Sequence, residues 1–304
     1  MSVPDSKTIV IILHYRGIED TLACLASVLP QRCDRLDILL VDNGSSDDLA
    51  ARVATRFGTV PMLRLPENRG WSGGNNAGIA WAREHGAGIV CLLNNDTIIP
   101  PGTFDHLIET VRSLGSCLLQ PAIDFADPAE GVQIDPSVSP NARPLTGHTD
   151  LFALDFTYGA CLTIPVAVFD RIGVFDERFF LQLEEADLYE RAKRVGIPSL
   201  CTTSVRILHA ESRSFGGRKT PEKFYYTVRN SLLLAEKNLS RPSIPLAILR
   251  QLYWMTSYRA ALETRTSIWA MMRWAASDAP HARALRAAIR DYALRRFGKW
   301  CAAP

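Results

Sequence analysis

The sequence predicts an α/β fold in which a mostly parallel central sheet is flanked by helices. Apolar runs of strand length recur along the first third of the chain, and each ends at polar or glycine-rich residues; they lie at 8–15, 36–48, 60–67 and 88–96. Segments with helical spacing of apolar residues alternate with these runs. Because a parallel strand covered on both faces is apolar along its whole length, the pattern predicts parallel strands buried between helices.

The helices are expected at 18–31, 48–57, 75–86, about 184–195, and from about 221 onward. Ser46 or Asp47 is expected to cap the second helix, and Gly196 to end the fourth. The Gly/Asn-rich stretch 68–78 is expected to be a loop that leads into the third helix. Residues 124–150 are rich in Pro, Asp and Gly, so we expect a long loop or a hairpin there, a feature that is often functional.

The composition is that of an ordinary globular protein. Of the 304 residues, 47% are hydrophobic and 22% are charged, and a net charge of +2 indicates no particular partner. We expect no nucleic acid among the partners. No 18-residue stretch is free of charge, and the apolar run 9–13 is too short for a signal peptide, so we expect a cytoplasmic protein without a transmembrane helix. The seven cysteines lack C-x-x-C spacing, which argues against a zinc site or a disulfide framework.

Polar residues follow three of the predicted strands. Asp42, Asn68 and Asp96 each come just after an apolar run. Because ligands of parallel α/β sheets bind beyond the carboxyl ends of the strands, we expect these residues to meet in one crevice. The Asp42 carboxylate is placed to accept hydrogen bonds from a base or a ribose, and an Asx turn is the structural alternative.

Two further stretches suit a phosphate and a metal. The four glycines of 66–78 let backbone N–H groups approach a phosphate beside a helix N-terminus, although a flexible turn would have the same composition. The stretch matches neither G-x-G-x-x-G nor a P-loop. In "LLNNDT" (92–97), Asp96 is a lone carboxylate after a strand. Mg²⁺ or Mn²⁺ on a diphosphate needs only one or two carboxylates, and a strand-end turn is the alternative.

The start of the fourth helix carries three carboxylates. Glu184 and Asp187 share one side of the helix, while Glu185 points elsewhere. A carboxylate can act as a general base, but the helix dipole would lower its pKa unless burial or a neighbouring acid opposes that effect. A favourable acidic first turn is the structural alternative. His209, after a predicted strand, is either a metal ligand that suits Mn²⁺ better than Mg²⁺ or a satisfied core histidine.

Together these features resemble the inverting family 2 glycosyltransferases of GT-A fold, especially their rhamnosyltransferase-like branch. The resemblance covers roughly 8–235 and rests on the order and spacing of "VIILHYRG", "LLVDNGSSDD", "ENRGWSGGNNAGI", "LLNNDTIIPPG", "YGACLTIPVAVFDRIGVFDERFFLQLEEADLYERAKRVG" and "ILHAESRSFGG". It implies a Rossmann-like sheet flanked by helices, with a C-terminal helical extension. We therefore expect a catalytic domain at 1–235 and the extension at 236–304.

The resemblance implies a nucleotide-sugar donor and assigns the site residues by their position. Asp96 would be the metal carboxylate at the family's D-x-D position, and His209 would complete the metal and diphosphate site. Glu185 would be the catalytic base and Asp187 would orient the acceptor or the base, with the division of roles among these residues and Glu184 left open. The donor pocket would contain His14, Tyr15, Asp42, Asn68, Arg69, Gly70, Asn75, Asn94 and Asn95.

The implied reaction is a single in-line displacement that inverts the anomeric carbon. The branch implies dTDP-L-rhamnose as donor, with a UDP-sugar as the alternative, and Mg²⁺ or Mn²⁺ as the cofactor. The acceptor would be a hydroxyl of a glycan or lipid-linked glycan in cell-surface polysaccharide synthesis. The chain departs from the family by reading N-N-D in place of D-x-D and by having Glu185 in place of an aspartate base. One carboxylate implies weak metal binding before the donor arrives.

Other classes of protein fit the sequence less well. A nucleotide-sugar-binding protein that has lost transfer activity is the main alternative, but Asp96, Glu185 and His209 are all retained. The missing G-x-G-x-x-G argues against an NAD-linked oxidoreductase. A nucleotidyltransferase would typically need a phosphate loop near residue 15, which "HYRGIED" does not supply.

The C-terminal part contains a basic amphipathic stretch at 281–300. Arginines lie along one side of this predicted helix, and Leu285, Ile289 and Tyr292 lie along another. Such a helix can lie on an anionic membrane surface, or it can pack against the catalytic domain or a second subunit. Peripheral attachment to the inner face of the cytoplasmic membrane, a homodimer and internal packing are therefore the alternatives.

Overall fold

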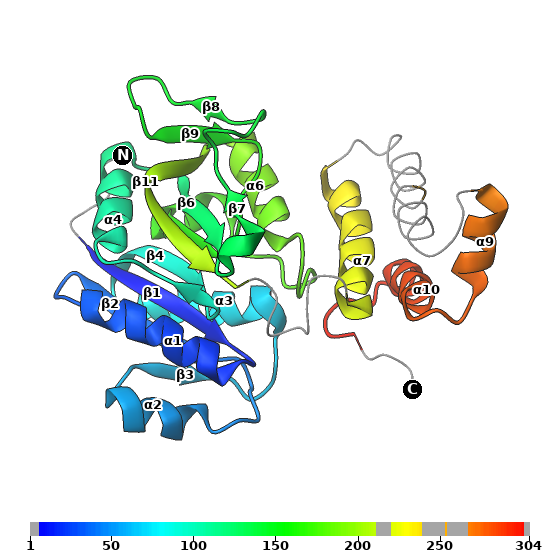
Figure 1. Cartoon of the computed structure of the whole chain (residues 1–304), viewed down its shortest axis with the longest axis horizontal. Coiled ribbons are helices and arrows are strands. Elements are labelled where there is room, and N and C mark those ends of the chain that lie inside the picture. The colour runs from blue at the N-terminus through cyan, green and yellow to red at the C-terminus, as the bar shows by residue number, and fades with distance from the viewer. Residues whose placement is uncertain (1–5, 211–219, 239–252, 254–266, 301–304) are drawn as a thin grey trace.

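The computed structural model describes residues 6–210, 220–238, 253 and 267–300. The described chain forms an α/β unit with a group of helices from the C-terminal part beside it (Figure 1). Part of the predicted motif "ILHAESRSFGG", residues 211–217, lies outside the described residues. Among the helices of the described ranges, none is long and apolar enough to cross a membrane.

The strands form one mixed sheet in the order β3-β2-β1-β4-β10-β6-β11-β9-β8, with β5 paired to β11 and β7 paired to β6. Neighbours among β3, β2, β1 and β4 are parallel, as are β6 and β11, while β10 runs antiparallel between β4 and β6. The prediction of a mostly parallel central sheet is confirmed. The strands are β1 (Lys7–His14), β2 (Leu36–Asp42), β3 (Met62–Arg64), β4 (Ala87–Asn94), β5 (Thr97–Ile98), β6 (Leu118–Phe125), β7 (Val132–Ile134), β8 (Arg143–Pro144), β9 (Leu151–Leu154), β10 (Cys161–Pro165) and β11 (Ser199–His209).

Helices cover both faces of this sheet. The helices of the α/β unit are α1 (Ile18–Val28), α2 (Leu49–Phe57), α3 (Gly70–Glu84), α4 (Thr103–Leu114), α5 (Val166–Ile172) and α6 (Glu184–Arg194), with 3₁₀ turns at Leu29–Gln31 and Pro128–Glu130. Apolar residues of α1, α2 and α4 share one buried cluster with the sheet, and those of α3, α5 and α6 share the other. The predicted helices at the start of the chain and near residue 184 are confirmed.

The central strand β1 shows why its sequence is apolar throughout. Val10 and Ile12 belong to the cluster under α1, whereas Ile9 and Ile11 belong to the cluster on the opposite face. All four side chains are at most 1% exposed. Because successive strand residues point to opposite faces, a strand between two helical layers must be apolar at every position.

The expected loop at 68–78 is wrong for most of its length, because α3 begins at Gly70. Three of its glycines face the sheet or the loop before α6 at positions where a Cβ atom would overlap a neighbour. At Gly78 that atom would lie 2.5 Å from Ile11 Cγ2, and at Gly74 it would overlap Leu13 Cδ1. The glycines therefore allow a helix to pack very close to β1, and this packing outweighs their low helix propensity.

The remaining predictions for single elements have mixed outcomes. The residue at the N-cap of α2 is Asp48, without a side-chain cap, so the prediction of Ser46 or Asp47 as the cap is wrong. The Asp47 carboxylate still accepts a hydrogen bond from the Leu49 amide (3.3 Å). Within 124–150, β7 pairs antiparallel with β6, which confirms the hairpin. Gly196 follows the end of α6 with φ +72°, as the predicted helix end requires.

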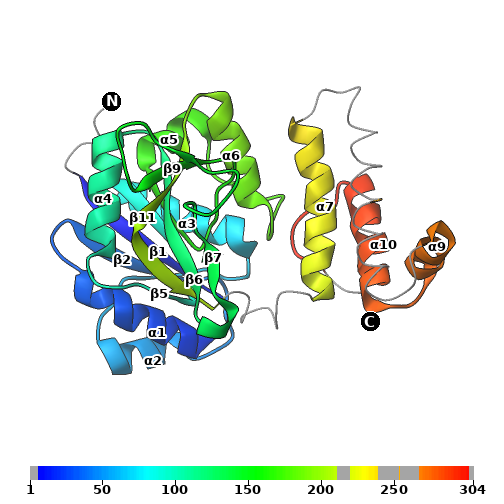
Figure 2. The ribbon, with the colours of Figure 1, turned by 45° about the horizontal axis from the view of Figure 1, so that its top comes forward.

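The C-terminal helices pack together beside the α/β unit. They are α7 (Pro221–Asn238), α9 (Ile268–Ala276) and α10 (Pro280–Ala293), and α7 passes position 235, where the domain boundary was placed. Figure 2 shows α10 alongside α7, and Leu285 and Ile289 of α10 belong to a cluster with Tyr225 of α7. The apolar side of the basic helix therefore faces the chain's own α7.

Candidate functional site

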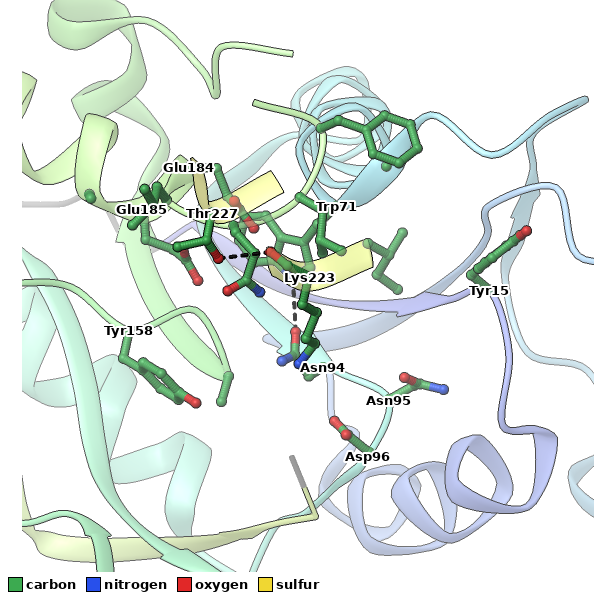
Figure 3. Close-up of a pocket in the computed structure, with 18 of the residues that line it drawn as sticks. Tyr15, Trp71, Asn94, Asn95, Asp96, Tyr158, Glu184, Glu185, Lys223 and Thr227 are labelled. Carbon is green, nitrogen blue, oxygen red and sulfur yellow. Dashed lines mark hydrogen bonds between the residues drawn. The ribbon is translucent and has the colours of Figure 1, made fainter. Parts of the chain in front are cut away.

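A cavity of about 710 Å³ lies at the carboxyl ends of β1 and β4, between the α/β unit and α7. Its wall comes from the loops after the strands, the start of α3, the first turn of α6, the end of β11 and one side of α7. Predicted site residues that line it are Tyr15, Asn68, Gly70, Asn94, Asn95, Asp96, Glu184, Glu185 and His209. Figure 3 shows Glu184 and Glu185 across the cavity from Asn95 and Asp96. Nine of the fourteen predicted residues thus share one cavity.

Strand pairing brings Asp96 and His209 together from distant parts of the chain. Asp96 precedes β5, and the next residue, Thr97, is the register partner of His209 on β11. The Ala210 amide donates to the Asp96 carbonyl (2.9 Å), which fixes the turn. His209 Nε2 then lies 3.2 Å from Asp96 Oδ1, with both side chains at most 6% exposed.

Gln133 on β7 holds the other side of the His209 ring. His209 Nδ1 is 2.9 Å from Gln133 Oε1, and Gln133 Nε2 donates to the Tyr158 hydroxyl. An acceptor oxygen at Nδ1 favours the proton on that nitrogen and leaves the Nε2 lone pair directed toward Asp96, the arrangement that metal-binding histidines commonly have. Gln133 was not predicted as a site residue; it lies in the segment 124–150, which was expected to be a long loop or a hairpin.

Asp96 and His209 fit a divalent cation that is only partly held by protein. Within residues 6–210, 220–238 and 267–300, no three His, Cys, Asp or Glu side chains gather as a metal site. A carboxylate oxygen and an imidazole nitrogen suit Mn²⁺, and the carboxylate alone suits Mg²⁺, with the other positions left to phosphate oxygens and water. Weak metal binding before a diphosphate joins the site stays a prediction.

The two amides of the N-N-D motif tie the turn that carries Asp96 to its surroundings. Asn94 Oδ1 accepts from Trp71 Nε1 (2.9 Å). Asn95 Nδ2 donates to the Arg16 carbonyl (2.9 Å) and to Thr21 Oγ1 (2.8 Å). Both amides therefore position the β4–β5 turn, and the carboxylate of Asp96 is the motif's charged group at the cavity.

A pair of asparagines fixes the start of α3 at the cavity. Asn43 Nδ2 donates to Asn68 Oδ1 (3.1 Å) and to the Gly70 carbonyl (2.9 Å), and the Gly70 amide donates to Asn68 Oδ1 (2.8 Å). Asn43 also accepts from the Arg69 amide (3.0 Å). Asn43, which was not predicted, lines the cavity with Asn68.

His14 and Asp42 do not line the cavity. The buried ring of His14 contacts Thr21 Oγ1 (2.7 Å) and Asp47 Oδ2 (3.1 Å), and burial lowers the pKa of His14. The Asp42 carboxylate is 2% exposed and accepts from the amide of Ser45, three residues on (2.8 Å), so it closes a turn, which is close to the structural alternative that the sequence left open. Both residues support the loops at the strand ends.

Arg69, Asn75 and Asp187 also lie away from the cavity lining. Arg69 pairs with Glu177 through two hydrogen bonds of 3.0 Å, and Asn75 Nδ2 donates to the carbonyl of the preceding helical turn (3.0 Å). Asp187 is fully buried and pairs with Arg191 (2.9 Å) and Lys237 (2.6 Å). In this structure Asp187 ties α6 to α7.

Glu184 and Glu185 are the carboxylates that α6 presents to the cavity. Burial, together with the nearby Glu185 charge, raises the pKa of Glu184 well above its ordinary value against the opposing charge of Lys223. Within the described part of the chain, Glu184 Oε2 has no hydrogen-bond partner. Burial also raises the pKa of Glu185, against the opposing effect of the Glu185 and Gly159 amides. Because only Glu185 has such amide support from a second segment, we infer that Glu184 holds its proton to higher pH and Glu185 is the first to ionise.

The side of the cavity formed by α7 was not predicted. Lys223, Phe224 and Thr227 of α7 line it, with Trp71 of α3 and Tyr158 of the loop before β10. In Figure 3 the Lys223 side chain extends from α7 toward Asn94. No spacing in the sequence indicates that residues beyond 220 return to the strand ends, because that return depends on tertiary packing.

Replacing Gly70 by Ala should destabilise the protein and distort the side of the cavity formed by the start of α3. Gly70 has φ +74°, and a Cβ atom would overlap the Phe180 carbonyl and ring. The backbone strain costs about 1–2 kcal/mol, and the overlap adds roughly 1–3 kcal/mol. Gly86→Ala is the matched control, since Gly86 has φ +73° with nothing within 4 Å of the added atom. Urea denaturation and nucleotide titration of both variants check this; equal losses would contradict the close contact with Phe180.

Comparisons with known proteins agree with this architecture. Residues 8–173 match the family model described as "Glycosyl transferase family 2". The chain is 25% identical over 244 residues to the low-salt glycan biosynthesis hexosyltransferase Agl10 of Haloferax volcanii, covering 76% of each chain. It is 27% identical over 218 residues to an N-acetylglucosaminyl-diphospho-decaprenol L-rhamnosyltransferase of Mycobacterium tuberculosis, covering 60% of this chain and 68% of that one.

A solved structure shares the fold over nearly the whole chain. The mannosyltransferase PcManGT of Pyrobaculum calidifontis, in complex with GDP-Man and Mn²⁺, superposes with a TM-score of 0.54 at 15% identity and covers 96% of this chain and 87% of that chain. The family match spans more than half of the 304 residues. The chain therefore belongs to glycosyl transferase family 2, has the GT-A fold, and is a glycosyltransferase.

Proposed function

We propose that this glycosyltransferase is metal-dependent and inverting, and that it transfers L-rhamnose from dTDP-L-rhamnose to a hydroxyl of a glycan or lipid-linked glycan during cell-surface polysaccharide synthesis. The observation that carries the proposal is the arrangement of one cavity. The pair Asp96 and His209 lies on one side, and the carboxylates of Glu184 and Glu185 lie on the other (Figure 3).

The names of similar proteins support the finer parts of this proposal. The mycobacterial relative is an L-rhamnosyltransferase whose name includes a diphospho-decaprenol acceptor, which supports a rhamnosyl donor and a lipid-linked glycan. The GDP-Man and Mn²⁺ bound to PcManGT support a nucleotide-sugar with a divalent cation in this fold. A cytoplasmic, membrane-peripheral location is part of the proposal, because a lipid-linked acceptor lies at a membrane surface.

Asp96 and His209 would hold the diphosphate end of the donor, and Tyr15, Asn43 and Asn68 would line the pocket for its nucleoside. Bound Mg²⁺ or Mn²⁺ supplies positive charge that stabilises the diphosphate as it leaves. Asn94 and Asn95 keep the Asp96 turn in place without adding charge. This division leaves α6 and α7 to receive the acceptor.

Glu185 would act as the general base. As the acceptor oxygen bonds to the anomeric carbon, the bond from that carbon to the diphosphate breaks and the hydroxyl proton passes to Glu185. The raised pKa of Glu185 makes its carboxylate a stronger base than an exposed glutamate. Attack opposite to the leaving group inverts the anomeric configuration and needs no covalent intermediate.

A donor panel tests the proposal. The full chain with Mn²⁺ should release nucleoside diphosphate from dTDP-L-rhamnose faster than from UDP-glucose, UDP-GlcNAc or GDP-mannose, measured by ion-exchange chromatography with and without a diphospholipid-linked GlcNAc acceptor. Mass spectrometry should detect the acceptor with one added deoxyhexose. Faster turnover of a UDP-sugar would show that the donor is a UDP-sugar and not dTDP-L-rhamnose. Binding of a nucleotide-sugar without any turnover would favour the alternative function, a catalytically weak nucleotide-sugar-binding protein.

A further inference from the structure

Two polar residues of α7 are completely buried outside the cavity lining. Arg229 and Asn230 are both 0% exposed, and Arg229 is the largest fully buried side chain of the described residues. Neither residue is used by the proposed chemistry. Burial of a guanidinium group is costly unless its charge is compensated and its N–H groups are hydrogen-bonded, so the partners of these two residues need to be identified.

The Asn230 amide binds the backbone that leads into α6. Its Nδ2 lies 2.7 Å from each of the carbonyl oxygens of Phe179, Leu181 and Gln182. Its Oδ1 accepts from Arg229 Nε (3.0 Å). One side chain of α7 therefore contacts three of the four backbone carbonyls of residues 179–182.

Arg229 binds the same stretch of backbone and also the segment after α10. Its Nη2 donates to the carbonyls of Arg178 and Phe179 (3.0 Å each), and its Nη1 donates to the Gly298 carbonyl (2.8 Å). The guanidinium also lies over the ring of Phe297, with its carbon 5.6 Å from the centroid. Carbonyl oxygens and aromatic faces thus compensate the buried charge, and the segment after α10 joins the contact.

The stretch that the pair holds is strained and adjoins the site. Phe180, Gln182 and Leu183 all have positive φ angles, at 59°, 72° and 68°. Non-glycine residues keep such conformations only where the surroundings fix them. Glu184 follows directly as the first residue of α6, and the Phe180 carbonyl accepts from the Trp71 amide (2.7 Å) at the start of α3. The segment 178–183 therefore connects the base-bearing helix to the donor-side helix.

We propose that Arg229 and Asn230 are positioning residues that hold segment 178–183 in its strained form, so that Glu184 and Glu185 face the Asp96 side of the cavity. The assignment rests on the proposed function for its catalytic part. It gives α7 and the segment 294–300 a role in positioning the two glutamates, whereas the sequence offered membrane, dimer or packing roles for the extension 236–304.

Asn230→Asp is the central test, because it keeps the shape of the side chain but places an acceptor where three carbonyls need a donor. We expect kcat to fall about 10- to 100-fold, the scale of a displacement of roughly 1 Å at a catalytic group, while the affinity for dTDP stays within about twofold. Arg229→Lys, which keeps the charge but loses the forked donors, should act in the same direction. If Asn230→Asp does not fold, Arg229→Lys takes its place as the test.

The matched control is Tyr292→Phe. The Tyr292 hydroxyl donates from α10 to Glu236 of α7 (2.8 Å), so its loss weakens the packing of α10 on α7 and leaves the hydrogen bonds of Arg229 and Asn230 to the carbonyls of 178–183 in place. kcat of this control should stay within about twofold of wild type. An equal fall of kcat in the control, or an unchanged kcat in Asn230→Asp, would overturn the proposal.

Hydrogen–deuterium exchange gives a readout that does not depend on activity. Amides of 178–188 should exchange at least about tenfold faster in Asn230→Asp, while those of β1 and β2 stay protected. If wild type turned over no donor, the proposed function would fail, and this exchange pattern would still test the positioning role. Unchanged exchange in 178–188 would overturn it.

Discussion

Replacing Glu185 by Gln should lower the rate of sugar transfer by about 10²–10⁴-fold, the usual contribution of a general base. Glutamine keeps the size and the burial of the side chain but cannot take the acceptor proton. Donor affinity should stay within about twofold, because Asp96, His209 and the asparagines on the opposite side are unchanged. Single-turnover transfer and calorimetric titration of the donor measure the two effects separately.

The pH dependence gives an independent check on the same residue. Burial raises the pKa of Glu185 above its ordinary value of 4.5, so the rate in wild type should fall as pH drops through that raised pKa. The glutamine variant should lack this acidic limb. Glu184→Gln is the control, since Glu184 is inferred to hold its proton already; it should retain most of the activity. A larger loss of transfer rate in Glu184→Gln than in Glu185→Gln would show that Glu184, and not Glu185, is the general base.

Replacing Asp96 by Asn should remove most of the dependence on Mn²⁺. The change leaves His209 as the single protein ligand and removes the negative charge that draws the cation to the diphosphate. We expect a fall in kcat of roughly 10²–10³-fold, similar to the loss of one preorganised electrostatic contact in a transition state. Titration of Mn²⁺ by electron paramagnetic resonance in the presence of dTDP measures the metal directly.

Asp124→Asn is the control for this change. Asp124 lies on β6 and pairs with Arg206 on β11 (2.8 Å), the strand that also carries His209. The variant therefore makes the same chemical change beside β11 but outside the cavity lining. Its Mn²⁺ binding should match that of wild type. If Asp96→Asn bound Mn²⁺ with dTDP as tightly as wild type does, Asp96 would not be the metal carboxylate.

The sequence predicted the part of the fold and site that depends on local patterns. Strands such as β1 are apolar at every position because both faces are covered, and a polar residue at a strand's carboxyl end marks the crevice. That reasoning placed Asn68 and Asp96 at one cavity. The helical spacing of apolar residues after Glu184 and the helix end at Gly196 were equally local, and α6 lies where they indicated.

The errors and omissions come from packing between distant segments. The spacing of Gly74 and Gly78 predicted a loop, but these glycines let α3 approach β1, a contact that no local propensity contains. Asp42 lies at the carboxyl end of β2 as predicted, yet its carboxylate contacts the Ser45 amide and Arg64. Whether a strand-end carboxylate faces the cavity or closes a turn is decided by its neighbours in space.

The C-terminal helices illustrate the same limit on a larger scale. Helical spacing identified the basic helix, but only the fold shows that its apolar side meets α7 and that Arg229 reaches the Gly298 carbonyl. A chain that ends near residue 275 would lose this contact. Tests of membrane binding are therefore better made on the full chain, with charge reversals at exposed arginines of α10 and vesicles of anionic lipid.

The most direct test of the central claim, that the cavity binds a nucleotide-sugar with a metal shared between protein and diphosphate, is calorimetric titration of the full chain. With Mn²⁺ present, dTDP-L-rhamnose or a UDP-sugar should bind one to one and at least about tenfold more tightly than without it, while Mn²⁺ alone binds weakly. A folded protein that binds none of these nucleotide-sugars, with or without Mn²⁺, would contradict the claim.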